Sequence, residues 1–98
     1  KEAGESMWPM EIPEEVRSVL DSNVADIANV GFNPSPNAGM MVGAAFLREF
    51  VDEKTAWVHI DIAPPAFNSG SAYGYTPFGA TGVGVRTLVQ LASQLAND

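Results

Sequence analysis

The chain has 98 residues, which limits it to one domain with a modest hydrophobic core. Its 12 acidic and 5 basic residues give a formal net charge of -7, which argues against nucleic acid or an anionic membrane as a partner. The absence of cysteine excludes disulfides and thiolate metal sites and fits a cytoplasmic location.

The first predicted element is a short helix that begins at Pro13. Proline suits the first turn of a helix, and the two glutamates that follow it interact favourably with the positive end of the helix dipole. Val19 and Leu20 belong to the apolar face of this helix. Residues 24–30 fit either a helix or an extended segment, and the pattern does not decide between them.

A second helix is predicted over residues 38–51, after a loop of glycine, proline and asparagine at 31–37. Asn37 is its expected N-cap. The helix is apolar nearly all round, with charged residues only near its end. A surface helix shows one apolar stripe, so this pattern predicts a buried helix.

The best strand signal runs from Ala56 to Ile62, where apolar residues alternate with Trp57, His59 and Asp61. Two prolines end it. A glycine-rich and tyrosine-rich loop is expected at 67–80.

Thr81 is the expected cap of a last helix at 82–96. Its apolar residues recur at helical spacing. They are Val85, Leu88, Val89, Ala92 and Leu95.

These elements predict the α/β class, with two main helices, one short helix and one confident strand. A lone strand leaves its backbone hydrogen-bonding groups unpaired on both edges. A two-faced strand beside a fully apolar helix belongs inside a larger layer. We therefore expect that the missing neighbours come from other segments or from copies of the chain.

Two groups of residues suggest binding sites. His59 and Asp61 lie on one face of the predicted strand, where they fit either a metal site or a hydrogen-bonded polar face. No third ligand has a suitable spacing. The glycine-rich segment Gly79–Arg86 enters a helix and fits either a phosphate site or a closely packed helix start with Arg86 paired to a carboxylate.

Several stretches together resemble the end of the leucyl aminopeptidase (cytosol aminopeptidase) family, in the family's order and near its spacing. The resemblance covers essentially all of residues 1–98. The stretches are Gly4–Met10 with Ile12-Pro13, Asp21-Ser22 with Val24–Asp26, Ala44–Val51, Trp57–Ala63, and Ala80–Gly82 with Val85–Leu88.

The resemblance implies part of a three-layer αβα sandwich with a mixed sheet. It also implies a hydrolase that removes N-terminal amino acids from peptides with two divalent metal ions, Mn or Zn. Its expected substrates carry an apolar N-terminal residue. Family members assemble as homo-oligomers, namely hexamers, and the resemblance implies a cytoplasmic location.

The family's metal and catalytic residues lie partly in an N-T-D-A-E-G-R-L motif, which does not occur here. We expect residues 1–98 to be the C-terminal portion of the catalytic domain, with those motifs upstream, so no catalytic residue, metal ligand or cofactor is expected in this chain. The resemblance assigns Ala63 and Ala66 to the substrate side-chain pocket. This chain departs from similar family members at two positions. Pro64 stands where they typically have glycine, and Phe78 stands where they often have lysine.

One alternative is a non-catalytic, self-associating binding module. The unpaired strand and the apolar loop both favour association with other copies of the chain. An inactive enzyme fragment is expected to expose sheet edges and former core surface, whereas an autonomous module is expected to be a stable monomer with a closed core.

Overall fold

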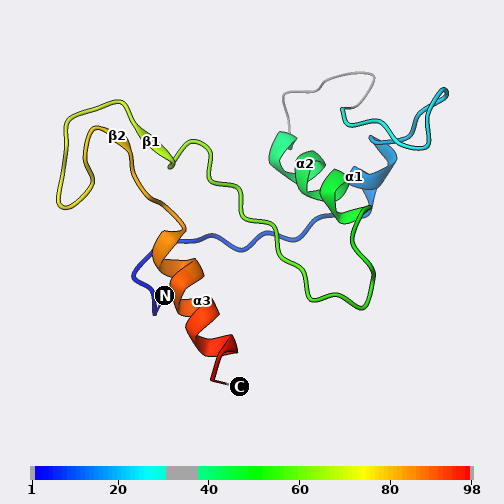
Figure 1. Cartoon of the computed structure of the whole chain (residues 1–98). Coiled ribbons are helices and arrows are strands. Elements are labelled where there is room, and N and C mark those ends of the chain that lie inside the picture. The colour runs from blue at the N-terminus through cyan, green and yellow to red at the C-terminus, as the bar shows by residue number, and fades with distance from the viewer. Residues whose placement is uncertain (1, 31–37, 98) are drawn as a thin grey trace. The chain divides into compact units, whose positions relative to one another are not determined.

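The computed structural model describes residues 2–30 and 38–97. These residues form helices and one antiparallel sheet, which is compatible with the predicted α/β class. The three-layer sandwich stays a prediction. The elements in chain order are α1 (Glu15–Ser18), α2 (Gly39–Arg48), β1 (Phe67–Asn68), β2 (Gly79–Ala80) and α3 (Val85–Leu95), as Figure 1 shows.

The chain divides into two compact units. One is Met10–Ile60, which we call the helical unit. The other combines Lys1–Pro9 with Asp61–Asp98, and we call it the hairpin unit because it holds β1 and β2.

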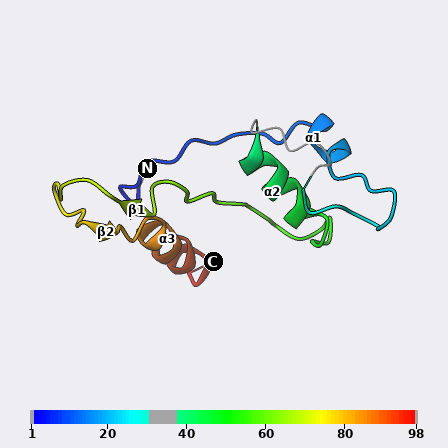
Figure 2. The same cartoon turned by 90° about the horizontal axis from the view of Figure 1, so that it is seen from above.

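In the helical unit, α1 lies beside α2 in both views of the chain (Figure 1 and Figure 2). Leu20, which follows α1, is fully buried, and Ala44 and Ala45 of α2 are also buried. The Arg17 Nε atom lies 2.8 Å from the Glu49 carboxylate, so an ion pair joins the end regions of both helices. The short helix near Pro13 is therefore confirmed, with Leu20 in the core.

The second helix forms as predicted but is shorter, since it begins at Gly39 and ends at Arg48. Its proposed cap, Asn37, lies outside the described residues. The prediction of a helix buried all round is wrong here, because Met40 and Leu47, near its two ends, are exposed. Among the helices and strands of the described segments, α2 contacts only the short α1, which is too small to cover every face.

The predicted strand at Ala56–Ile62 is also not found, since no strand is assigned to these residues. A strand is defined by ladder hydrogen bonds to a neighbour. Among the described residues, only β1 and β2 pair with each other, so residues 56–62 have no partner strand there.

The segment expected to be a plain loop forms a hairpin instead. Phe67 pairs with Ala80 and Asn68 with Gly79 in an antiparallel register. Tyr73 and Thr76 form a further bridge near the tip. Because such pairs are only two residues long, the alternation that signals a strand in sequence has no room to develop.

The last helix follows the predicted apolar spacing but begins later than expected, at Val85. Gly84 precedes it with φ +87°, a conformation that glycine adopts without strain. None of the residues of α3 is buried, and Val89 and Leu95 are both more than half exposed. No helix in the described ranges is long and apolar enough to cross a membrane.

Candidate functional site

The structure places Ala63 and Ala66 in one tight turn that leads into β1. The Ala63 amide donates to the Asp61 carboxylate at 2.9 Å, and the Ala66 amide donates to the Ile62 carbonyl at 2.8 Å. Ala63 is exposed, while Ala66 is half-buried. The peptide bond between Ala63 and Pro64 is cis. The predicted pocket residues therefore share one local structure, which we call the alanine turn (residues 62–67).

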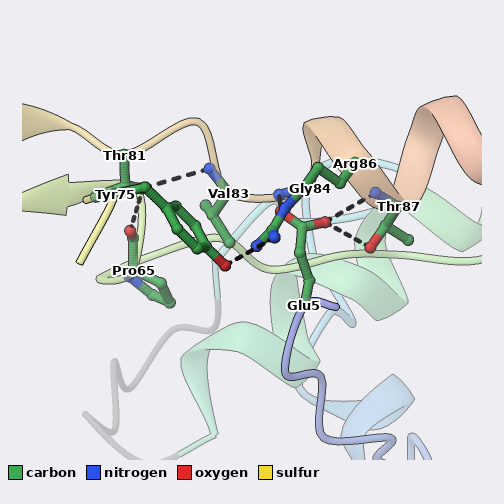
Figure 3. A network of polar contacts seen from close by, with 8 residues as sticks. All are labelled: Glu5, Pro65, Tyr75, Thr81, Val83, Gly84, Arg86 and Thr87. Atoms are coloured by element: carbon green, nitrogen blue, oxygen red, sulfur yellow. Dashed lines mark hydrogen bonds and ion pairs between the residues drawn. The ribbon is translucent and has the colours of Figure 1, made fainter. Parts of the chain in front are cut away.

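Thr81 holds the alanine turn from across the hairpin. Its amide donates to the Ala66 carbonyl at 3.0 Å, and its hydroxyl donates to the Pro65 carbonyl at 2.6 Å. The same hydroxyl oxygen accepts a hydrogen bond from the Val83 amide at 3.3 Å, as Figure 3 shows. The prediction that Thr81 caps α3 is therefore wrong. Thr81 instead links the alanine turn to the start of that helix.

The cap of α3 comes from the other end of the sequence. The Glu5 carboxylate accepts hydrogen bonds from the amides of Gly84 and Thr87, both at 2.8 Å, and from the Thr87 hydroxyl (Figure 3). Only 5% of the Glu5 side chain is exposed. These bonds satisfy amide groups that the first turn of a helix leaves free.

The contacts of Glu5 also set its protonation. The Thr87 hydroxyl, then the amides of Thr87 and Gly84 and the charge of Arg86, lower the pKa of this carboxyl, while desolvation raises it in part. The net direction is downward, so Glu5 is ionised at neutral pH. A carboxylate of the chain itself already occupies the anion position at this helix start, which argues against the phosphate site considered at Gly79–Arg86.

Arg86 joins this cluster to the tip of the hairpin. Its Nε atom lies 3.9 Å from the Glu5 carboxylate, and an outer nitrogen donates to the Tyr75 hydroxyl at 2.7 Å. The guanidinium carbon also lies 4.8 Å from the centre of the Tyr75 ring, within the range of a cation–π contact. The expected pairing of Arg86 with a carboxylate is confirmed.

The described residues do not fit the implied pair of divalent metal ions. No group of three or more histidine, cysteine or acidic side chains comes together in the ranges 2–30 and 38–97. Asp61 accepts the Ala63 amide, and the His59 ring stacks on Trp57 with 6.3 Å between ring centres. The described side chains of this chain therefore offer no site for that pair of ions.

The family model described as the cytosol aminopeptidase family, catalytic domain, matches residues 1–89. The chain belongs to the cytosol aminopeptidase family. It is 52% identical over 96 residues to a probable cytosol aminopeptidase of Streptomyces griseus, and 50% identical over 95 residues to one of Mycobacterium tuberculosis. These matches cover 98% and 97% of the chain but only 18% of each relative. No solved structure shows a significant match.

The family resemblance singled out Ala63 and Ala66 but predicted neither the alanine turn that contains them nor the residues that hold it. The Thr81 hydroxyl was expected to serve α3, because a threonine before a helix usually caps it. The role of Glu5 has no local signal, since its hydrogen-bond partner Thr87 lies 82 positions away.

Proposed function

We propose that residues 1–98 form the C-terminal portion of the catalytic domain of a metal-dependent leucyl aminopeptidase, which removes N-terminal amino acids from peptides. The match of residues 1–89 to the catalytic domain of the family carries this proposal. Ala63 and Ala66 then contribute to the wall of the pocket for the first side chain of the substrate. Their small side chains leave room for a leucine-sized group.

The exposed apolar surface of the chain supports a role as part of a larger domain. In the hairpin unit, Gly84 is the only buried residue among those described, while Phe67, Phe78 and Leu88 are all more than half exposed. Large apolar side chains that gather on a folded surface mark an interface. We propose that these side chains are covered by the rest of a polypeptide as long as the curated relatives. The same additional segments supply strand partners for residues 56–62 and complete a three-layer αβα sandwich.

Family membership supports the rest of the proposal. The two divalent ions, Mn or Zn, bind residues outside this chain, which supplies pocket wall rather than chemistry and is inactive alone. The whole protein takes peptides with an apolar N-terminal residue and assembles as a homo-oligomer, a hexamer, in the cytoplasm. The net charge of -7 is consistent with the absence of nucleic acid or membrane partners.

A chimera tests this proposal. This chain replaces the matching 96-residue segment of the Streptomyces griseus relative, and hydrolysis of leucine p-nitroanilide is measured with Mn or Zn. The unaltered relative is the control. We expect metal-dependent turnover by the chimera and none by the 98-residue chain alone. A folded chimera without turnover, together with a stable monomer with a closed core for the isolated chain, would instead favour an autonomous binding module.

The proposed role of Ala66 in the pocket is tested by a substitution in the same chimera. Ala66→Leu fills the proposed pocket, so kcat/KM for the leucine substrate is expected to fall about 10- to 100-fold relative to the alanine substrate. Ala66→Gly, which keeps the space open, is the matched control and is expected to retain the preference for leucine. An unchanged ratio in Ala66→Leu would remove Ala66 from the pocket.

A further inference from the structure

The alanine turn has few backbone groups by which it can be held in place. Pro64 and Pro65 have no amide hydrogen, so these positions offer only carbonyl oxygens to the rest of the protein. The turn closes on itself through the Ala66 and Phe67 amides, which donate to Ile62 and Pro64. Any restraint at Pro65 from outside the turn must therefore come from a donor that reaches its carbonyl.

Thr81 supplies that donor. The register of the hairpin pairs Phe67 with Ala80, so Ala66 lies opposite Thr81 in the next position. The amide of Thr81 continues this ladder by donating to the Ala66 carbonyl, a contact that any residue except proline makes. The hydroxyl reaches one residue further, to the Pro65 carbonyl at 2.6 Å, and only a hydroxyl-bearing side chain such as threonine or serine places a donor there.

The hydroxyl is itself fixed at a second point. Its oxygen accepts the Val83 amide at 3.3 Å, and the next residue, Gly84, donates to the nearly buried carboxylate of Glu5 (Figure 3). The hydroxyl hydrogen is thereby directed toward Pro65. A continuous series of hydrogen bonds runs from the alanine turn through Thr81 to the capped start of α3.

We propose that Thr81 is a positioning residue for the substrate side-chain pocket. The hydroxyl of Thr81 holds the alanine turn in the position that gives a leucine side chain of the substrate a close fit. This inference rests on the proposed function, because it requires Ala63 and Ala66 to line that pocket. Thr81 touches neither substrate nor metal in this role. It acts on selectivity through the Pro65 and Ala66 carbonyls.

Two substitutions at Thr81 isolate the hydroxyl. Thr81→Val has nearly the same shape and keeps the backbone bond to Ala66, but it cannot donate to Pro65 or accept from Val83. Thr81→Ser keeps both hydroxyl contacts. Thr76→Val is the matched control, since Thr76 pairs with Tyr73 at the hairpin tip through backbone atoms.

The kinetic test uses the chimera with leucine and alanine p-nitroanilide. Thr81→Val is expected to lower the leucine-to-alanine ratio of kcat/KM about tenfold, mainly through a higher KM for the leucine substrate. Thr81→Ser and Thr76→Val are expected to keep the ratio of the unsubstituted chimera. An equal fall of kcat/KM on both substrates in Thr81→Val would leave the leucine-to-alanine ratio unchanged. That result would overturn the positioning role but leave the aminopeptidase assignment intact.

A second measurement does not depend on turnover. Hydrogen–deuterium exchange of the chimera is expected to quicken in Thr81→Val at the Val83 amide and at the Ala66 and Phe67 amides of the turn. Thr81→Ser is expected to restore slow exchange. Unchanged exchange in Thr81→Val would show that the hydroxyl does not hold the turn. A folded chimera that hydrolyses neither substrate would refute the proposed function, and with it the role in selectivity, even if exchange responds as expected.

Discussion

The Glu5 carboxylate accepts a hydrogen bond from the Thr87 amide at 2.8 Å, although 82 positions separate the two residues in the sequence. A helix usually receives its N-terminal cap from the residue just before its first turn. In α3 that position is held by Gly84, which has no side chain to offer. Glu5, near the start of the described residues, supplies the missing acceptor.

Replacing Glu5 with glutamine is expected to loosen the start of α3. The carboxylate presents two acceptor oxygens to three donors, whereas an amide presents one oxygen and turns an NH2 group toward other donors. Hydrogen exchange at the Gly84 and Thr87 amides should be faster in Glu5→Gln. Glu2→Gln is the control, because Glu2 accepts a hydrogen bond from the exposed Gln94 side chain, away from the Gly84 and Thr87 amides. Exchange at those two amides in Glu2→Gln should match that of the unaltered chain.

The same cap predicts an acid-sensitive helix. The pKa of Glu5 is lowered from its usual 4.5 by the Thr87 hydroxyl and the neighbouring amides, so the folded state binds a proton less readily than the unfolded state. Its stabilising contribution is therefore complete above the usual pKa and is lost as the pH falls through the lowered value. Circular dichroism of α3 in a pH titration should show this loss, and Glu5→Gln should lack it. Identical pH titrations of the unaltered chain and Glu5→Gln would contradict the role of the Glu5 carboxylate as the cap of α3.

Two glycine-to-alanine substitutions should act in opposite directions. Gly84 has φ +87°, and an added Cβ meets no atom within 4 Å, so alanine there costs about 1–2 kcal/mol through backbone conformation alone. Gly43 lies inside α2 with open space around it, and alanine is the better helix former by about 1 kcal/mol. Chemical shifts of backbone carbons should report less helix at α3 in Gly84→Ala and more at α2 in Gly43→Ala. A gain at both sites would contradict the backbone argument for Gly84.

Leu20 should be the most sensitive position of the helical unit. It is fully buried, so Leu20→Ala is expected to cost about 2–3 kcal/mol, the lower part of the range for buried leucines because the surrounding core is small. Val19 is 41% exposed, and Val19→Ala should cost less than about 1 kcal/mol. Exchange of the buried Ala44 and Ala45 amides measures both effects. Similar costs at positions 19 and 20 would show that this contact does not organise the unit.

Local patterns in the sequence predicted the helices well. The spacing of Val85, Leu88 and Leu95 predicts α3 because an apolar stripe depends only on residues within a few turns. Features of this kind are encoded by neighbours in the chain, so they can be predicted without knowing the fold.

Features that depend on distant partners were missed or misassigned. Residues 56–62 have the alternation of a strand, yet a strand also needs a neighbour, and none of the described segments supplies one. The Thr81 hydroxyl faces two competing partners, a helix start and a turn 16 positions away, and binds both. Side-chain chemistry alone does not rank such alternatives, because the ranking depends on which backbone groups the fold brings near.

The hairpin unit draws its residues from both ends of the chain, with Met10–Ile60 intervening. Glu5 is made before Thr87 and gains this hydrogen-bond partner only after the 82 positions that separate them have been added. Contacts of such long sequence separation form late and slow the folding of a chain. Removal of the first few residues should consequently loosen a helix at the opposite terminus, whereas a circular permutation that joins the two ends would turn this long-range cap into a local one.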